Sequence, residues 1–335
     1  QLGDGAALAA TTRINVVSDL RAMDLALGGQ GAPIVPIGEK LLLSGYELFL
    51  NLGGIANISS HGGASAGPQP GGSPAGGANG PQTGGSPAGG TDGPRTGGSP
   101  AGGTDGPSAG GFVAYDVCPA NRVLNQLAAL TGKEYDEGGA LASTGRVDET
   151  LLRRLNALPY YGQAYPKSLA NEFGTDTVYP IITEAGLVVA DALRTYVEHI
   201  AIQIREAVKG LAMGQPAAKA GMGAAAAGEP AAKAGTQSAD QPANQPAAGK
   251  RMLVTGGGAH NHFLIGRLQD LLLPLGVAVV VPSSETDSAL VDYKEALVMA
   301  LIGVLRWREE NNVLASVTGA SRDSIGGAVW IGQEA

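Results

Sequence analysis

The chain has 335 residues and a formal net charge of -8 at pH 7, because 22 lysines and arginines stand against 30 aspartates and glutamates. This length is ample for one large hydrophobic core or two smaller ones, and the acidic balance argues against a nucleic-acid partner. The single cysteine, Cys118, excludes an internal disulfide and predicts a cytoplasmic protein. No apolar run reaches the roughly 20 residues of a membrane span, so no membrane partner is expected.

The sequence begins at Gln1 rather than at methionine, and no signal peptide is evident, so we expect an N-terminus that is truncated or processed. An alanine-rich helix and a strand at Ile14–Val17 come first. Asp19 directly follows that strand, where a carboxylate can either meet a ligand or cap the next turn. The glycine-rich run Gly28–Pro33 is either a connector or a ligand-facing loop.

The stretch Leu48–Ser59 predicts a β-hairpin with a tight glycine turn. Apolar residues flank Gly53–Gly54 and the two asparagines Asn51 and Asn57. Glycine allows the backbone N–H groups of such a turn to approach an anion closely. An ordinary hairpin is the alternative, but the anion site is favoured because Asp116 follows a second strand and a glycine loop follows a third.

Two low-complexity segments interrupt the chain, at residues 62–110 and 214–249. The unit Gly71–Thr83 repeats as Gly84–Thr96 in the first, and Pro-Ala-Ala-Lys-Ala-Gly occurs twice in the second. Both segments lack valine, isoleucine, leucine and aromatic residues. Because they cannot bury enough apolar surface to offset the entropy lost on ordering, we predict that both are disordered insertions.

A strand at Gly111–Tyr115 leads to Asp116, which we expect at the strand end, facing a cleft. Pro119 is expected to open an amphipathic helix, and capping of that helix by Asp116 is the alternative. Cys118 has no histidine partner and is assigned to packing. The segment Tyr135–Leu169 is expected to be irregular and to line a cleft.

The longest predicted helix covers Leu187–Val208, where apolar residues keep a 3.6-residue period. Arg194 and His199 lie in it and are expected to be solvated or at the edge of the core. Further strands are predicted at 251–255, 277–281 and 328–331, and further helices at 262–272 and 294–309. Strands that alternate with helices after a hairpin predict an α/β fold.

Gly256, Gly257 and Gly258 follow a strand and precede a helix, an arrangement that directs free N–H groups and the helix dipole at a phosphate or nucleoside. A dinucleotide fold is the competing interpretation, but the third spaced glycine and the acidic residue of its fingerprint are missing. His260 and His262 lack further cysteine or histidine partners, so no protein-bound metal is predicted.

Several stretches, in chain order, resemble the bacterial anhydro-N-acetylmuramic acid kinase family: Gln1–Asp4, Asp24–Pro33, Asn51–Asn57, Asp116–Asn121, Val254–Asn261, Lys294–Ala296 and Ser316–Ala320. The likeness covers everything outside the two insertions. The Asp116–Asn121 motif departs from the commoner Asp-Thr-Gly-Pro-Gly-Asn and keeps only its aspartate, proline and asparagine. The resemblance implies an α/β actin-like ATPase fold of the ribonuclease H type, a mixed sheet flanked by helices. Residues 1–46 would be the remnant of a first lobe and 47–335 the second lobe.

The resemblance also implies a reaction and its site. ATP, with Mg²⁺, would phosphorylate 1,6-anhydro-N-acetylmuramic acid on O6 while water opens the anhydro bridge, a step of peptidoglycan recycling, and Asp116 would be the base that activates the water. The implied nucleotide-binding residues are Asn51, Gly53, Gly54, Asn57, Gly256, Gly257, Gly258 and Asn261. The implied sugar-binding residues are Gln1, Asp19, Asp24, Gln30, Asn121 and Glu295. Glu295 is placed at the start of a helix, where stabilisation of the helix dipole is the alternative role.

One motif of the family, a Gly-Thr-Ser-x-Asp-Gly phosphate loop near its N-terminus, has no counterpart in the sequence. The sequence therefore predicts either a fragment or a natural truncation without ATP turnover. The alternative function is accordingly a catalytically inactive relative that binds a sugar or a nucleotide. The oligomeric state is left open, with a homodimer as one expectation.

Overall fold

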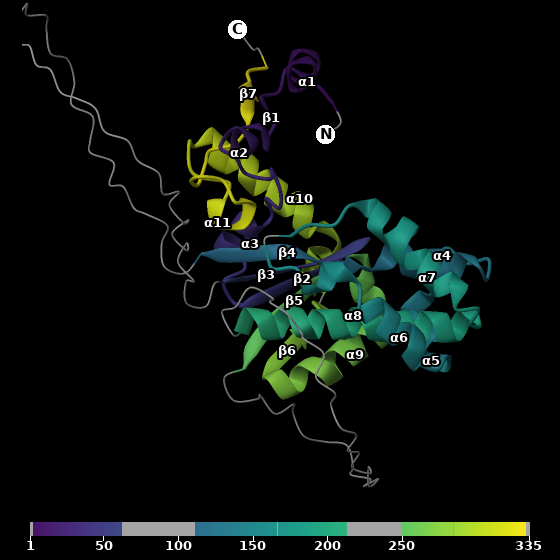
Figure 1. The fold of residues 1–335 in the computed structure, drawn as a ribbon. Coiled ribbons are helices and arrows are strands. Elements are labelled where there is room, and N and C mark those ends of the chain that lie inside the picture. Colours follow the sequence, from purple (N-terminus) through teal and green to yellow (C-terminus); the bar gives the residue numbers. More distant parts are fainter. Residues whose placement is uncertain (1–2, 62–110, 166, 213–248, 284, 333–335) are drawn as a thin grey trace, which may run out of the picture.

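The computed structural model describes residues 3–61, 111–165, 167–212, 249–283 and 285–332. Gln1 and almost all of the two low-complexity segments lie outside these residues, so the predicted disorder stays a prediction. The described part folds around a five-stranded mixed sheet and a separate two-stranded sheet (Figure 1).

The larger sheet has the strand order β4-β3-β2-β5-β6. β3 pairs antiparallel with β2 and β4, whereas β5 pairs parallel with β2 and β6. The strands are β2 (Leu48–Leu52), β3 (Ile55–His61), β4 (Phe112–Pro119), β5 (Lys250–Thr255) and β6 (Val277–Val280). This mixed sheet with flanking helices confirms the predicted fold class, and the hairpin β2–β3 turns at Gly53–Gly54 as predicted.

Helices make up most of the remaining described residues. The α-helices are α1 (Gly5–Thr12), α2 (Ala22–Ala26), α3 (Pro36–Leu42), α4 (Asn121–Ala129), α5 (Ala140–Thr144), α6 (Glu149–Asn156), α7 (Tyr179–Glu184), α8 (Val189–Ala212), α9 (His262–Leu272), α10 (Glu285–Trp307) and α11 (Ala315–Thr318). Short 3₁₀ or π turns are η1 (Glu137–Gly139), η2 (Pro159–Gly162), η3 (Phe173–Val178), η4 (Gly257–His260) and η5 (Leu273–Leu275).

The sheet separates two hydrophobic cores, because successive side chains of a strand point to opposite faces. Leu50 and Val254 pack on the face covered by α4, α8 and α9. Phe49 and Leu253, their chain neighbours, pack on the face covered by α3, α10 and α11. Figure 1 shows α8 and α9 below the sheet and α3, α10 and α11 above it.

The two-stranded sheet joins the two ends of the described chain. β1 (Val16–Ser18) pairs antiparallel with β7 (Ala328–Trp330). Ile34 and Ile37, which precede the large sheet, share a core with Val298 of α10. Residues 3–46 thus pack against the C-terminal part of the chain, and their assignment to the remnant of a first lobe stays a prediction.

Two expectations about the region of Asp116 are wrong. β4 continues to Pro119, so Asp116 lies inside the strand rather than at its end, because the last two residues of β4 still pair with the first two of β3. α4 begins at Asn121 rather than at Pro119, and its N-cap residue, Ala120, provides no side-chain cap. Asp116 therefore does not cap this helix.

The segment Tyr135–Leu169 is also more regular than expected, since it contains α5 and α6. The carboxylate of Asp148 accepts a hydrogen bond from Leu151 N at 2.7 Å and so caps α6. Leu151 and Leu155 of α6 are fully buried. A local cap and a short apolar stripe are enough to form a helix once a neighbouring core covers the stripe.

His199 is fully buried in α8, which corrects the expectation of a solvated or core-edge position. Its Nδ1 lies 2.7 Å from Asn156 Oδ1, and its Nε2 lies 3.0 Å from the Tyr161 hydroxyl. Asn156 Oδ1 also accepts from Gln203 Nε2, so His199 donates from Nδ1 and accepts the Tyr161 proton at Nε2. Burial lowers the pKa of His199 to about 3, which keeps the ring neutral.

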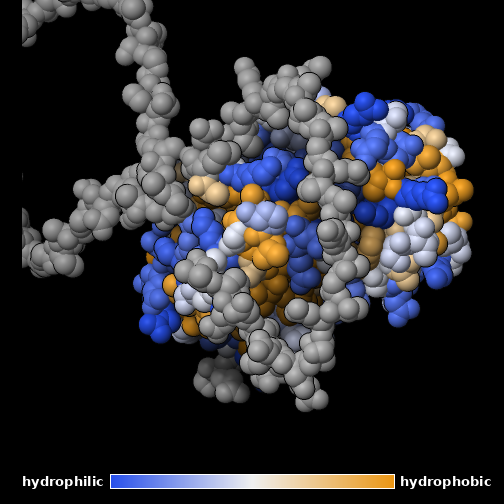
Figure 2. All heavy atoms as spheres, turned by 90° about the horizontal axis from the view of Figure 1, so that it is seen from below, coloured by the Kyte–Doolittle hydropathy of each residue, from blue (hydrophilic) through white to orange (hydrophobic). Residues whose placement is uncertain are grey.

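Hydrophilic side chains occupy much of the face turned to the viewer in Figure 2, and hydrophobic ones show between them. Apolar side chains are exposed along α10, at Tyr293, Leu297, Val304 and Trp307. In the described part of the chain, no helix combines the length and the apolar character needed to cross a bilayer.

The buried His199 predicts a pH-dependent stability. Its folded pKa lies below the ordinary value of 6.5, so below pH 6.5 the unfolded chain binds a proton that the folded chain does not. This contribution is complete above pH 6.5 and falls by about 1.4 kcal/mol per pH unit as the pH drops towards 3. We expect urea midpoints of the wild type to fall more steeply between pH 7 and pH 5 than those of His199→Gln. The exposed His262→Gln should keep the wild-type slope, and a wild-type slope in His199→Gln would show that His199 is not the titrating group.

Candidate functional site

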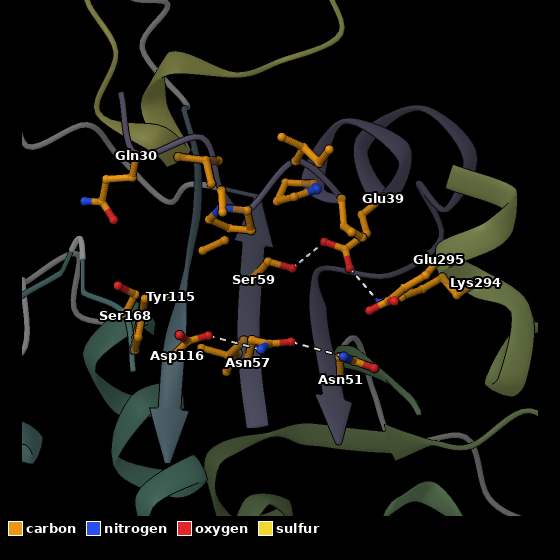
Figure 3. Close-up of a pocket in the computed structure, with 18 of the residues that line it drawn as sticks. Gln30, Glu39, Asn51, Asn57, Ser59, Tyr115, Asp116, Ser168, Lys294 and Glu295 are labelled. Atoms are coloured by element: carbon orange, nitrogen blue, oxygen red, sulfur yellow. Dashed lines mark hydrogen bonds and ion pairs between the residues drawn. The ribbon is translucent and has the colours of Figure 1, made fainter. Parts of the chain in front are cut away.

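Three polar side chains form a row across neighbouring strands. Asn51, Asn57 and Asp116 are register partners on β2, β3 and β4. They face the α10 side of the sheet because the residues beside them in each strand face α8. Asn51 Nδ2 donates to Asn57 Oδ1 at 3.2 Å, and Asn57 Nδ2 donates to Asp116 Oδ1 at 3.1 Å (Figure 3).

Neutral groups hold the Asp116 carboxylate in place. Besides Asn57, the backbone N–H of Leu169 donates to Oδ2 at 2.8 Å. The backbone of Asp116 is fixed as well, since its carbonyl accepts from the Tyr160 hydroxyl at 2.6 Å and its N–H donates to Lys167 O. No lysine or arginine in the described ranges forms an ion pair with Asp116. Each carboxylate oxygen therefore retains capacity to accept a further proton donor.

The row lines a cavity of about 340 Å³, which we call the Asp116 pocket. Its polar lining residues are Arg21, Gln30, Glu39, Asn51, Asn57, Ser59, Asp116, Lys167, Ser168, Lys294 and Glu295. In Figure 3, Asp116 and Ser168 lie on one side of the asparagines, and Glu39 and Lys294 lie on the other. The volume suits a small molecule such as a single sugar.

Only some of the residues proposed to contact the sugar lie at this pocket. Gln30 and Glu295 line it, whereas Gln1 lies outside the described residues. Glu295 stands inside α10, which begins at Glu285, so its placement at a helix start is wrong, as is the first-turn alternative. Asn121 lines a different cavity, described below.

Asp19 and Asp24 do not line the Asp116 pocket, so their contact with a sugar stays a prediction without support from this cavity. Asp24 is fully buried, where it accepts hydrogen bonds from Gly31 N at 2.7 Å and from the Thr318 hydroxyl at 2.6 Å. It ties the glycine-rich loop to α11. Asp19 is exposed and accepts a hydrogen bond from the neighbouring Ser18 hydroxyl.

A buried ion pair forms the wall opposite Asp116, and sequence reasoning did not assign it to the site. Lys294 Nζ lies 2.7 Å from Glu39 Oε1, and the two side chains are 3% and 4% exposed. The Ser59 hydroxyl donates to the other oxygen of Glu39. Glu39 carries no local signal of this role, because its partner is 255 positions away. The only indication in the sequence that Lys294 belongs to the site is its position in a stretch that resembles the family.

Removal of one member of this ion pair should destabilise the fold. Lys294→Met would leave the Glu39 charge buried without a counter-ion, and we expect a loss of roughly 3–5 kcal/mol in unfolding free energy. The double variant Glu39→Gln/Lys294→Met should recover part of that loss. Lys40→Met, on the exposed side of α3, should change little. Equal midpoints for Lys294→Met and Lys40→Met in urea would show that the pair adds nothing.

We call Gly256, Gly257 and Gly258 the glycine loop. A second cavity of about 560 Å³ lies at this loop, and we call it the glycine-loop pocket. It is lined by Asn121, Leu124, Asn125, Tyr135, Asp136, Glu137, Gly138, Gly257, Gly258, His260, Asn261 and His262. The expectation that the segment Tyr135–Leu169 lines a cleft is confirmed only near its two ends, since Tyr135–Gly138 line this pocket and Lys167 and Ser168 line the Asp116 pocket.

The hairpin and the glycine loop fit tightly against each other. A Cβ on Gly256, which has φ +84°, would lie 2.6 Å from Asn51 Oδ1. A Cβ on Gly258 would lie 2.7 Å from the Cβ of Leu52. Asn121 Nδ2 donates to Leu52 O at 2.9 Å and fastens α4 to the same strand end. The two pockets are therefore held in a fixed relation by β2.

Asn261 lines this pocket, and the Gly53–Gly54 turn is hydrogen-bonded to Asn121, another of its lining residues. Asn261 Oδ1 accepts from Leu264 N at 3.0 Å and caps α9. The carbonyls of Gly53 and Gly54 accept from Asn121 N and Ala120 N, whereas no carbonyl in the described turns and loops accepts from the Gly53 or Gly54 N–H. A Cβ at either glycine would meet no atom closer than 3.5 Å. This turn therefore has room and N–H donors for an anion, and its use as an anion site stays a prediction.

The packing of the glycine loop predicts that substitution by alanine lowers stability at Gly258 but not at Gly257. Gly258→Ala forces its new methyl group against Leu52, and we expect a loss of about 1–3 kcal/mol in stability. Gly257→Ala should be nearly neutral, since its Cβ would meet only Asn121 Nδ2, at 3.8 Å. Neither glycine has a positive φ, so steric fit alone separates them. Thermal unfolding without ligand tests this, and equal midpoints for the two variants would refute it.

A mixed sheet with one polar pocket around a carboxylate and another around a glycine loop is a setting in which α/β proteins bind small ligands. The sequence model of the family described as anhydro-N-acetylmuramic acid kinase matches residues 1–75, 107–226 and 232–332. The chain belongs to this family.

Individual relatives agree with the family match. The anhydro-N-acetylmuramic acid kinase of Gloeobacter violaceus is 30% identical over 96% of this chain, and that of Rhodococcus erythropolis is 31% identical over 99% of it. The chain spans 66% of the length of each relative. Among solved structures, an activator of 2-hydroxyisocaproyl-CoA dehydratase from Clostridium difficile with bound ADPNP aligns over 84% of this chain and 69% of its own. That alignment has a TM-score of 0.36 and a sequence identity of 11%.

Proposed function

We propose that this chain supplies the catalytic carboxylate and both ligand pockets of an ATP-dependent kinase that opens and phosphorylates 1,6-anhydro-N-acetylmuramic acid. The observation that carries the proposal is the Asp116 carboxylate, which is held by Asn57 and Leu169 in a pocket of single-sugar size. Because the chain spans 66% of its relatives, we assign the activity to the product of the complete coding sequence.

In this proposal the Asp116 pocket holds the anhydrosugar, and Asp116 takes a proton from a water molecule. The water oxygen bonds to C1 of the sugar as the bond between C1 and O6 breaks. The released O6 bonds to the γ-phosphorus of ATP as the bond from that phosphorus to the β–γ bridging oxygen breaks and ADP leaves. Gln30 and Glu295, which line the same pocket, are assigned to the sugar hydroxyls. The neutral donors around Asp116 orient the carboxylate in the pocket.

The nucleotide is assigned to the glycine-loop pocket. The ring of Tyr135 and the amides of Asn121 and Asn125 offer stacking and hydrogen bonds to a nucleoside. The free N–H groups of the Gly53–Gly54 turn suit phosphates. Bound ATP supplies the phosphoryl group.

We include Mg²⁺ in the proposal because phosphoryl transfer from ATP uses this ion to neutralise the charge of the phosphates. The described residues include no group of three or more histidine, cysteine, aspartate or glutamate side chains that could hold a metal ion. Protein sites for Mg²⁺ with nucleotides use few carboxylates, and phosphates and water complete the coordination. A cytoplasmic setting and a role in peptidoglycan recycling are part of the same proposal, as is a protein that works without nucleic-acid or membrane partners.

The base assignment is tested by Asp116→Asn. This change keeps the side-chain size but removes the proton acceptor, so we expect kcat to fall at least ~100-fold. Calorimetric affinity for the anhydrosugar and for a non-hydrolysable ATP analogue should stay near that of the wild type. Normal turnover by the variant would rule out Asp116 as the base.

Two further variants separate chemistry from structure. Asp19→Asn changes an exposed carboxylate outside both pockets and should leave turnover unchanged. Asn57→Leu removes a donor to Asp116 but keeps the carboxylate, so its loss of kcat should be smaller than that of Asp116→Asn. If Asn57→Leu lost as much activity as Asp116→Asn at equal thermal stability, turnover would depend on the orientation of the Asp116 carboxylate rather than on its role as a base.

A further inference from the structure

Lys167 is a cation of the Asp116 pocket without an acidic partner. Three basic side chains line the pocket, namely Arg21, Lys167 and Lys294. Lys294 is neutralised by its buried ion pair with Glu39. Lys167 Nζ donates to the backbone carbonyl of Tyr160 at 3.3 Å, and no carboxylate within the described ranges forms an ion pair with it.

The ammonium group of Lys167 is nevertheless held in place. It lies 4.6 Å from the ring centre of Tyr160 and 5.7 Å from that of Tyr115. The Tyr115 ring is stacked on Tyr165, with ring centres 5.6 Å apart. Burial lowers the pKa of Lys167, so its surroundings disfavour the charged form when no anion is near. An anionic group on a ligand would relieve that penalty.

The position of Lys167 indicates which ligand carries the anion. Its backbone carbonyl accepts from Asp116 N, which places it beside β4, at one edge of the sheet. The glycine loop follows β5, and β3 and β2 lie between. The phosphates are assigned to the Gly53–Gly54 turn, which does not line the Asp116 pocket, so an anion at Lys167 belongs with the sugar.

A muramic acid sugar carries one ionised group, the carboxylate of its lactyl ether. We propose that Lys167 binds this carboxylate and selects acidic anhydrosugars over neutral ones. The inference rests on the proposed function, because it takes the Asp116 pocket as the sugar site. The hydroxyl of Ser168, the next residue and also part of the pocket lining, can donate a second hydrogen bond to the same group.

The test compares two sugars that differ in the charge of the lactyl group and in one methyl group. The probes are 1,6-anhydro-N-acetylmuramic acid and its methyl ester, each titrated calorimetrically into the product of the complete coding sequence without nucleotide. The wild type should bind the acid more tightly. Lys167→Met should weaken binding of the acid roughly 10- to 100-fold and leave the ester unaffected. Lys167→Arg, which keeps the charge, should retain part of the preference.

Matched variants test whether the preference for the acid depends on Lys167 in particular. Lys133→Met removes an exposed lysine outside both pockets and should keep the full preference for the acid. Arg21 lines the pocket but is exposed and has no aromatic support, so Arg21→Met should reduce the preference less than Lys167→Met does. Thermal midpoints verify that each variant is folded.

The outcomes separate this inference from the function on which it rests. If the wild type bound acid and ester equally, or if Lys167→Met kept the preference, the inference would be overturned and the kinase proposal would stand. A loss of affinity for both probes in Lys167→Met would also overturn it, because Lys167 would then support the pocket without recognising the charge of the carboxylate. If the wild type bound neither probe, the proposed function would fail together with the inference.

Discussion

The alternation of side chains along three adjacent strands is the constraint on which the Asp116 pocket depends. Asn51, Asn57 and Asp116 share one face only because their strand neighbours are buried on the other. A slip of one residue in any strand would turn a polar side chain into the α8 core and break the row. Between β3 and β4 the register shifts once, so that Val117 and Cys118 both enter that core while Asp116 keeps its face. Bulges of this kind commonly lie beside functional sites.

The opposite wall of the pocket depends on contacts that are distant in the sequence. Glu39 comes before the sheet and Lys294 after it, and their ion pair joins α3 to α10 above Ser59. A buried pair of charges gains little net stability over a well-packed apolar pair, because both ions lose their hydration. Its value here is geometric, since a mismatched arrangement of the two helices would leave two charges buried and unpaired. The pair therefore fixes the wall relative to Asp116.

The sequence predicts well those features that local patterns determine. The hairpin at Gly53–Gly54, the glycine loop at Gly256–Gly258 and the helix His262–Leu272 follow from turn residues and from the period of the apolar residues. The sequence does not predict the position of a side chain that depends on a partner far away in the chain. The family resemblance assigns Asp24 to the sugar, and nothing local in the sequence indicates that Thr318 and the backbone of Gly31 are its hydrogen-bond partners. His199 can be buried because Asn156 and Tyr161 provide its hydrogen bonds. No local sequence pattern predicts either partner.

The row of asparagines also connects the Asp116 pocket to the glycine loop. Asn57 donates to Asp116 and accepts from Asn51, so the orientation of both amides is fixed by their hydrogen bonds. Asn51 Oδ1 then points towards Gly256, where only a glycine leaves room for it. A continuous set of contacts thus runs from the carboxylate assigned to the sugar to the loop assigned to the nucleotide. Because transfer between two bound groups requires their reacting atoms to be held within about 3–3.5 Å, a rigid spacer between the pockets is what such a reaction needs from this part of the fold.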